Sequence, residues 1–184
     1  QVDLVDIKQH LFVDSAVTLQ IPYEHDNSLI KTHTISTAQE AGWTWDIGLT
    51  TRRGIGYVYA SDYSSPEQAE YVLKQYIGPA AEQLTPRHIA MPVGYRKKQW
   101  HKNCVAIGLS AGFIEPLEST AIAMIELAAK YLCEEFPHTK SAMPLIEKRF
   151  NNVFIHRWQA IVDFVKLHYA LSKRTDSSFW LDNV

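Results

Sequence analysis

Hydrophobic and polar residues alternate with a period of two over the first third of the chain, which is typical of β-strands. Short apolar or alternating runs predict strands over residues 11–13, 16–22, 30–35, 43–47, 57–60 and 88–95. The glycine-containing segment 52–56 predicts a hairpin turn, with its two arginines in solvent. This part of the chain is therefore expected to be β-rich and antiparallel.

Other segments have apolar positions at the three- and four-residue spacing of helices. Ser65 as N-cap and Pro66 after it predict a helix to about Ile77, and Gly78-Pro79 would end it. A longer helical pattern starts near residue 120 and stops at Pro137, and another covers residues 141–171. The sequence thus predicts an α+β fold with long helices at its C-terminal end.

Residues 103–122 join the two kinds of pattern. Val105 to Ile107 is a short apolar run that stops at Gly108, as expected of a buried strand that enters a tight turn. The helix that follows would begin near Ser119 or Thr120. This segment is therefore predicted to be a strand, a glycine turn and a helix.

The same segment carries the candidate chemistry. Gly108 and Gly112 allow the backbone to approach a ligand closely, and a helix N-terminus directs N–H groups and a partial positive charge at an anion or an electron-rich ring. Glu115 and Glu118 lie among apolar residues, so one of them could be a desolvated carboxylate. The pattern fits equally well a structure in which Glu118 and Ser119 only cap the helix and the glycines only turn the chain.

Composition limits the function classes. The chain has 184 residues, 46% of them hydrophobic and 21% charged, and a net charge of −2, as expected of one soluble globular domain. Its basic residues are dispersed apart from the triplet at 96–98, which favours a solvated edge over a surface for nucleic acid or an anionic membrane. No apolar run is long enough for a membrane span, and no secretory signal opens the sequence.

Cysteine and histidine residues suggest neither disulfides nor metal ligands. Cys104 and Cys133 fall on apolar patterns without C-x-x-C spacing, so we expect reduced core thiols and a cytoplasmic location. None of the eight histidines belongs to a metal-ligand motif. His156 and His168 are expected to be ordinary, partly buried side chains of the last helix.

Two motifs resemble the signatures of the flavin-dependent tryptophan halogenases. Residues 108–122, GLSAGFIEPLESTAI, resemble the longer signature, and residues 43–47, WTWDI, match the Trp-x-Trp-x-Ile signature. Flanking pieces are similar too, so the resemblance covers most of the chain. Gly48 stands where many members of the family have proline, which leaves open whether the substrate is free tryptophan or another aromatic.

The resemblance assigns flavin and halide roles to residues of the turn and the helix. Leu109, Gly112 and Ile122 match cofactor-side positions. Thr120 and Ala121 match the pair whose backbone N–H groups bind halide. The family usually has glycine where Ala121 stands, and alanine keeps the N–H group.

The resemblance also assigns the catalytic and tunnel positions. Glu118 matches the carboxylate that touches the substrate and activates the electrophile, and Ser119 matches the link between the flavin and substrate sides. Trp43, Trp45 and Ile47 would lie on one face of a strand near the tunnel between flavin and substrate. An anion suits the first role because electrophilic substitution builds positive charge on an indole.

The implied enzyme is an FAD-dependent oxidoreductase with a monooxygenase-like fold. Reduced FAD, supplied by a separate flavin reductase, would react with oxygen and with chloride or bromide to give hypohalous acid, which reaches tryptophan or an indole-like aromatic. Residues 1–101 would form the β-rich portion of the catalytic domain, and residues 102–184 the flavin and halide side.

The sequence leaves three classes of function open. No G-x-G-x-x-G motif for the FAD diphosphate is present, and the chain starts with Gln1, so it is expected to be an inactive piece of a longer halogenase. A flavin hydroxylase of the same fold and a non-catalytic binding domain are the alternatives. The exact substrate, ring position, halide and oligomeric state are not specified by these residues.

Overall fold

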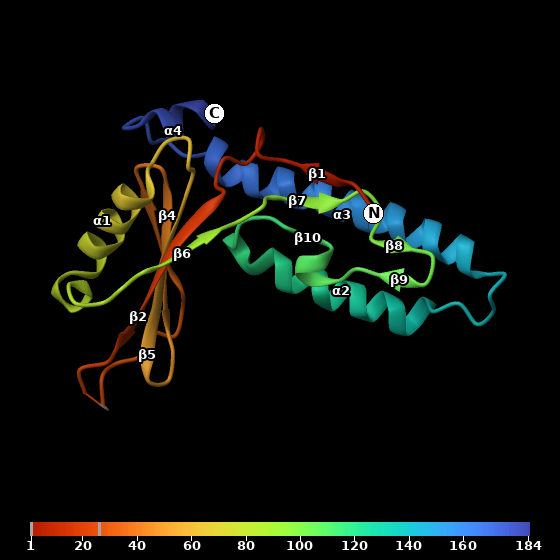
Figure 1. Cartoon of the computed structure of the whole chain (residues 1–184), viewed down its shortest axis with the longest axis horizontal. Helices are drawn as coiled ribbons and strands as arrows, with labels where there is room; N and C mark the ends of the chain where they lie inside the picture. Colours follow the sequence, from red (N-terminus) through yellow and green to blue (C-terminus); the bar gives the residue numbers. More distant parts are fainter. Residues whose placement is uncertain (1, 26) are drawn as a thin grey trace. The chain divides into compact units, whose positions relative to one another are not determined.

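The computed structural model describes residues 2–25 and 27–184 (Figure 1). The chain forms two compact units that interleave in sequence. Residues 1–11 and 92–170 form one unit, here the helical unit, and residues 12–91 and 171–184 form the other, here the sheet unit. Each is described by itself.

The sheet unit contains a five-stranded antiparallel sheet with strand order β3-β4-β5-β2-β6. Its strands are β2 (Ser15–Pro22), β3 (Ile35–Gln39), β4 (Gly42–Gly48), β5 (Arg52–Tyr59) and β6 (Arg87–Ala90). Its helices are α1 (Pro66–Ile77), the 3-10 turn η1 (Pro79–Ala81) and α4 (Ser178–Asp182). The predicted antiparallel, β-rich region is confirmed.

Helix α1 begins and ends where its sequence predicts. Ser65 Oγ accepts a hydrogen bond of 3.2 Å from the Gln68 N–H, and Gly78 ends the helix with a φ of 85°. Ala69 and Leu73 are fully buried and belong to one core cluster with apolar side chains of β2 and β5. Burial of this face stabilises the helix against the sheet.

Strand β4 is buried on both faces. Its register places Thr44 opposite Tyr57 and Asp46 opposite Ile55, so these two polar residues share the face that α1 covers. Trp43 and Trp45 lie on the other face, with their ring centroids 6.3 Å apart. The predicted strand is confirmed, but its polar positions are as buried as its indoles.

Three secondary-structure predictions for the sheet unit are wrong. Residues 52–56 lie within β5, and the turn is at 49–51, where the Leu49 N–H donates to the Arg52 carbonyl. Residues 11–13 are irregular, although their apolar side chains contribute to the core. Of the strand expected over 30–35, only Ile35 belongs to a strand, β3, because the pairing with β4 starts at that residue.

The helical unit has two long helices and short strands. Its strands are β1 (Leu4–Asp6), β7 (Gly94–Arg96), β8 (Trp100–His101), β9 (Cys104–Val105) and β10 (Gly112–Phe113). The order β1-β7-β10 forms one antiparallel sheet, and β8 pairs with β9. Two 3-10 turns, η2 (Gly108–Ser110) and η3 (Leu117–Ser119), precede α2 (Thr120–Glu135), which α3 (Met143–Ala170) follows.

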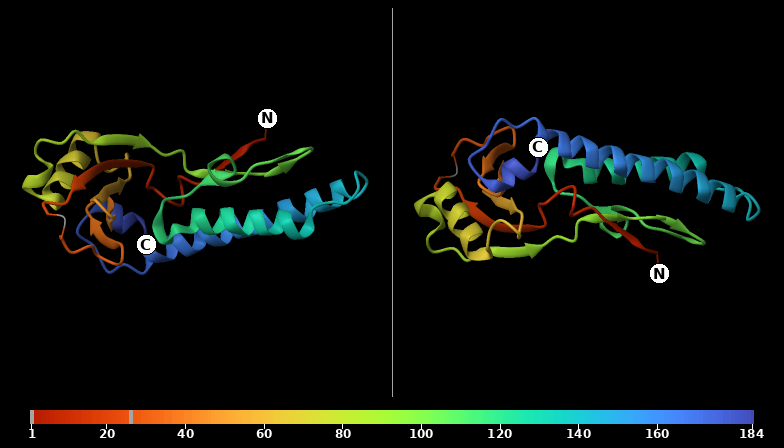
Figure 2. Two further views of the ribbon diagram at one scale, coloured as in Figure 1. Left: turned by 90° about the horizontal axis from the view of Figure 1, so that it is seen from below. Right: turned by 90° about the horizontal axis from the view of Figure 1, so that it is seen from above.

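Helices α2 and α3 run side by side (Figure 2). The buried positions of α3 recur every three or four residues: Phe150, Phe154, Trp158, Val162, Val165 and Tyr169. Tyr131 of α2 packs edge-on against Phe150 and Phe154, at centroid distances of 5.3 and 6.2 Å. Both helices predicted from the spacing are confirmed.

Two strand predictions for the helical unit and the burial predicted for its cysteines are wrong. The strand expected at 105–107 is only the two-residue β9, whose side chains are partly or fully exposed, because β8 is the one strand of the described residues that pairs with it. Cys104 and Cys133 are free thiols, as expected, but both are exposed rather than in the core. The single strand expected at 88–95 is divided into β6 and β7, which belong to different units.

The observed architecture has the predicted fold class, α+β, with antiparallel sheets, a turn that leads into a helix, and long helices toward the end. Within residues 2–25 and 27–184, no helix has the length and hydropathy that a membrane span needs.

Candidate functional site

A glycine turn precedes α2 in the helical unit. Gly108 has a φ of 64°, a left-handed conformation that favours glycine, so the turn predicted at this residue is confirmed. The Ser110 hydroxyl closes the turn, accepting 3.1 Å from the Ile107 N–H and donating 2.8 Å to the Ile107 carbonyl. Between them, Leu109 is 80% exposed.

Gly112 is a glycine for a reason that the sequence did not indicate. It is buried in β10, opposite Tyr95 of β7. A Cβ atom at Gly112 would lie 2.7 Å from the carbonyl oxygen of Gly94 and from Cα of Tyr95. Close strand packing therefore requires glycine here, while a contact with a cofactor stays a prediction.

The backbone directly before α2 is strained. Glu118 has φ 57° and ψ 16°, and Ser119 has φ 53° and ψ 28°, so two consecutive non-glycine residues are left-handed. Each such residue costs roughly 1–2 kcal/mol. Ser119 occupies the N-cap position but makes no side-chain capping hydrogen bond. Simple capping by this hydroxyl therefore does not explain the segment.

The two carboxylates of the segment have opposite environments. Glu115 is 1% exposed, and the Tyr169 hydroxyl lies 2.8 Å from its Oε1 and 2.7 Å from its Oε2. The side chain of Glu118 is 58% exposed, and its Oε1 lies 4.0 Å from Nε2 of His168. The desolvated carboxylate expected in this segment is therefore Glu115.

The last turn of α3 thus contributes two residues beside the signature. His168 is exposed, contrary to the expected partial burial, and its Nδ1 lies 2.8 Å from the Phe164 carbonyl, which accepts. That hydrogen bond leaves Nε2 on the side of Glu118, where a protonated imidazole would attract the carboxylate. His156, expected to be partly buried, is exposed as well.

The first turn of α2 combines donors with an apolar surface. Its first N–H groups cannot have partners within the helix, and they carry the positive end of the helix dipole. Thr120 is buried, whereas Ile122 is 68% exposed. Turn η2, which carries the exposed Leu109, packs against α2. This arrangement suits a small anion beside a flat apolar ring.

The Trp-x-Trp-x-Ile motif lies in the sheet unit, on β4. A Cβ atom at Gly56 of the neighbouring strand would lie 2.2 Å from Cζ2 of Trp45, so this glycine makes room for the indole. Trp43 is 7% exposed, and its Nε1 has no hydrogen-bond partner within the described part of the chain. Ile47 is exposed at the end of the strand.

An ion pair holds the opposite face of the same strand, where Asp46 lies. Both oxygens of the buried Asp46 accept from Arg53 of β5, through Nε at 3.1 Å and through Nη2. This hydrogen bonding raises the pKa of the Arg53 guanidinium, although burial opposes the shift. Arg53 is therefore a structural partner of the tryptophan strand, and the prediction that it is merely solvated is wrong.

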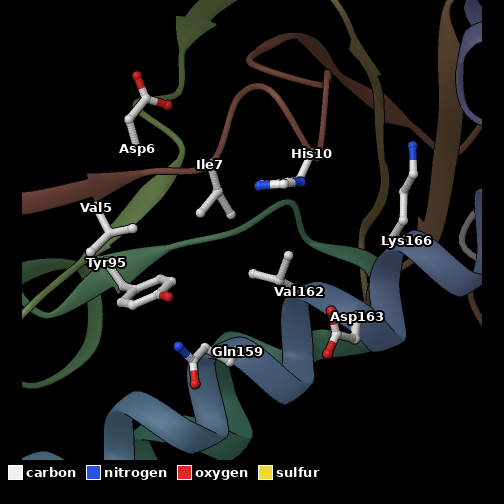
Figure 3. A pocket seen from close by; sticks show the side chains of 9 residues that line it. All are labelled: Val5, Asp6, Ile7, His10, Tyr95, Gln159, Val162, Asp163 and Lys166. Carbon is white, nitrogen blue, oxygen red and sulfur yellow. The ribbon is translucent and has the colours of Figure 1, made fainter.

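A cavity in the helical unit lies apart from the predicted site residues. It has a volume of about 280 Å³ and lies between β1, β7 and α3, where Ile7, His10 and Val162 point toward one another (Figure 3). Asp163 and Lys166 also line it, and burial lowers the pKa of the Lys166 ammonium. No predicted site residue lines this cavity, and its mixed charges favour neither an anion nor a cation.

The structure thus collects the turn, carboxylate and helix-start residues in the helical unit, and it places Trp43, Trp45 and Ile47 in the sheet unit. Tyr169 was missed from the sequence. It lies on the buried stripe of α3, four residues after Val165, so a hydroxyl on an otherwise apolar face was the available signal. Among residues 2–25 and 27–184, His, Cys, Asp and Glu side chains form no group of three that could hold a metal ion.

Comparison with known proteins identifies the family. A family model described as tryptophan halogenase matches residues 1–184, so the chain belongs to the tryptophan halogenase family. It is similar to the 7-chloro-L-tryptophan 6-halogenase of Kutzneria sp. (strain 744), with 43% identity over 98% of this chain and 35% of the relative. The chain therefore spans about a third of the length of the curated relatives it matches.

Solved structures agree with this assignment. The crystal structure of tryptophan halogenase from Shewanella frigidimarina NCIMB 400 superposes with a TM-score of 0.95 at 46% identity, over 100% of this chain and 35% of that one. A flavin-dependent tryptophan C-6 halogenase (chlorinase) from taromycin biosynthesis gives a TM-score of 0.94 at 42% identity, over 99% and 36%. The fold is thus that of part of a flavin-dependent tryptophan halogenase.

Proposed function

We propose that this chain supplies the flavin- and halide-side part of a halogenase that acts on tryptophan or another indole-like aromatic. The observation that carries the proposal is the position of Glu118. Its exposed carboxylate lies one residue before the N-cap of α2 and is held there by a left-handed backbone. A carboxylate and a helix N-terminus are thereby presented from one short segment.

The residues around the turn fit the ring portion of FAD. The exposed side chains of Leu109 and Ile122 offer aliphatic atoms that a flat ring can cover, next to a glycine turn that keeps the backbone open. Gly112 would support the turn through the close packing of β10 on β7. Bound reduced FAD would supply two of the electrons that reduce oxygen to water and hypohalous acid, and the halide, which is oxidised, would supply the other two.

Halide would bind at the start of α2. The N–H groups of Thr120 and Ala121 belong to the first turn of the helix, where backbone donors and the dipole favour an anion without any arginine. Thr120 is buried, and the attraction between a donor and an anion is stronger where the surroundings exclude water. Chloride and bromide both satisfy this chemistry.

Glu118 would act on the substrate side. Its carboxylate orients the electrophile and stabilises the positive charge that develops on the indole ring. Ser119, which follows it, would link the flavin and substrate sides through the strained backbone. Trp43, Trp45 and Ile47 would line the path between the sites and discourage ordinary oxygenation. A flavin reductase as supplier of reduced FAD and a cytoplasmic location complete the proposal.

The proposal is tested by Glu118→Gln in the full-length parent protein. The amide keeps the shape and removes the charge, so we expect about a 10²-fold or greater loss of halogenation turnover. Reduced flavin should still be oxidised at the normal rate, because the carboxylate acts after that step. Product is measured by chromatography, and flavin oxidation by absorbance.

Glu134→Gln is the matched control, since it removes an exposed carboxylate from the far end of α2. Near-normal halogenation by Glu118→Gln would limit Glu118 to a structural role at the helix start. Product formation that needs no halide would favour a flavin hydroxylase instead.

A further inference from the structure

The buried carboxylate of Glu115 has no role in the proposed chemistry, yet it has a built environment. It is 1% exposed, and both of its oxygens lie within 2.8 Å of the Tyr169 hydroxyl. Burial strengthens such a hydrogen bond, because little water competes for the carboxylate oxygens. The two residues are 54 positions apart, so the contact ties the signature segment to α3.

The segment from Glu115 to Thr120 has few free rotations. Pro116 has a φ of −75°, fixed by its ring, and its carbonyl accepts a 3.3 Å hydrogen bond from the Ser119 N–H. Glu118 and Ser119 lie between these points in left-handed conformations. Non-glycine residues keep such conformations only where the surroundings impose them.

Both ends of this segment are anchored on packed helices. Thr120 at the C-terminal end is the first residue of α2, and Glu115 at the N-terminal end is held by Tyr169 of α3. Tyr169 itself is buried on the same stripe of α3 as Val162 and Val165. Glu115 and Thr120 are thus both attached to packed helices, which restrains the backbone of the residues between them.

We infer that Tyr169 is a positioning residue, which holds the carboxylate of Glu115 so that the strained segment presents Glu118 and the first N–H groups of α2 in the reactive arrangement. This inference rests on the proposed function. It assigns no contact with substrate or cofactor to Tyr169 or to Glu115. His168, the neighbour of Tyr169, is near Glu118 itself and is not needed for this anchoring.

The test is Tyr169→Phe in the full-length parent, which keeps the ring and removes only the donor. A misplacement of Glu118 should lower the halogenated product formed per reduced flavin consumed by about 10- to 100-fold. The rate of flavin oxidation should stay normal. We call this ratio of product to flavin the coupling. A general loss of folded protein would lower product formation and flavin oxidation together, so lower coupling at a normal oxidation rate would be specific to positioning.

Tyr95→Phe is the matched control. It removes another buried tyrosine hydroxyl of the same unit, one that hydrogen-bonds Gln159 of α3. We expect Tyr95→Phe to match the wild type in coupling and to lose about as much thermal stability as Tyr169→Phe loses. Equal coupling in Tyr169→Phe and Tyr95→Phe would overturn the inference.

A double-mutant cycle with Glu115→Gln tests whether the two residues act through each other. If they do, the double variant should lose no more coupling than the worse single variant, within about 2-fold. Multiplied losses would mean that the residues act independently and would contradict the inference.

A crystal structure of the Tyr169→Phe parent gives a readout that needs no catalysis. We expect Glu118 and Ser119 to leave the left-handed region. An unchanged segment in this variant would refute the positioning role, even if the wild-type parent is a halogenase. A changed segment, together with a wild-type parent that forms no halogenated product, would refute only the proposed function.

Discussion

Replacing Gly56 with alanine would place a methyl group against the indole of Trp45. The added Cβ would lie 2.2 Å from Cζ2 and 2.3 Å from Cη2 of that ring, where an ordinary contact is 3.4–4 Å. The ring would have to move by about 1 Å or more. Because overpacking of this kind typically costs about 1–3 kcal/mol, we expect Gly56→Ala to lower the free energy of unfolding by that amount.

Gly54→Ala is the control on the same strand and the same face. There the nearest atoms to an added Cβ belong to the side chains of Gln20 and Leu49, at 3.7–3.8 Å, which is normal packing. This variant should be neutral or gain roughly 0.4–1 kcal/mol through the less flexible unfolded chain.

Urea unfolding followed by tryptophan fluorescence measures both variants. The native emission of Gly56→Ala should also shift, because the indole of the signature strand moves. Equal unfolding free energies for Gly54→Ala and Gly56→Ala would refute the reasoning that Gly56 is present to seat Trp45. A normal emission spectrum with reduced stability would mean that the backbone rather than the indole had moved.

Three further predictions address the halide, the core and the cofactor. In the full-length parent, Ala121→Pro removes one backbone donor and should weaken halide saturation by about 1–3 kcal/mol, whereas Ala121→Gly keeps the N–H and should not. Since a following proline disfavours the helical conformation of Thr120, the thermal midpoint of the proline variant is checked first, and unchanged halide dependence in a folded variant would place the halide elsewhere. Burial raises the pKa of Tyr57 from 10.0 to about 12, so the folded state keeps a proton that the unfolded state loses above pH 10. The contribution of the Tyr57 hydroxyl to the free energy of unfolding is complete below pH 10 and about 1.4 kcal/mol smaller at pH 11. Tyr57→Phe should not show this loss when urea titrations at pH 8 and 11 are compared. Equilibrium dialysis of this chain with FAD should detect no micromolar binding, because its glycines form no diphosphate-binding motif.

Periodicity and caps were sufficient to predict the regular elements. Helix α1 has a serine N-cap and a glycine stop, and α2 and α3 have apolar stripes long enough to be unambiguous. The tryptophan strand β4 was equally clear. Each of these elements is specified by residues within a few positions of one another.

The sequence could not predict features that depend on distant partners. An apolar run such as 105–107 does not show which strand pairs with it, and here its partner is the two-residue β8. Glutamate and serine have no strong preference for left-handed backbone, so the strain at Glu118 and Ser119 had no local signal. The contact of Glu115 with Tyr169 spans 54 residues and depends on the packing of α3.

The interleaving of the two units has a consequence for synthesis on the ribosome. All five strands of the sheet unit have been synthesised once residue 90 is added, but α4 follows only after the whole of α3. Trp180 Nε1 then donates to the Gln39 carbonyl at 2.8 Å, and the Ser177 hydroxyl donates to that of Glu40 at 2.6 Å. At about 5–20 residues per second, roughly 5–20 s separate these events. The turn between β3 and β4 therefore lacks these contacts with Ser177 and α4 while the helical unit is being synthesised.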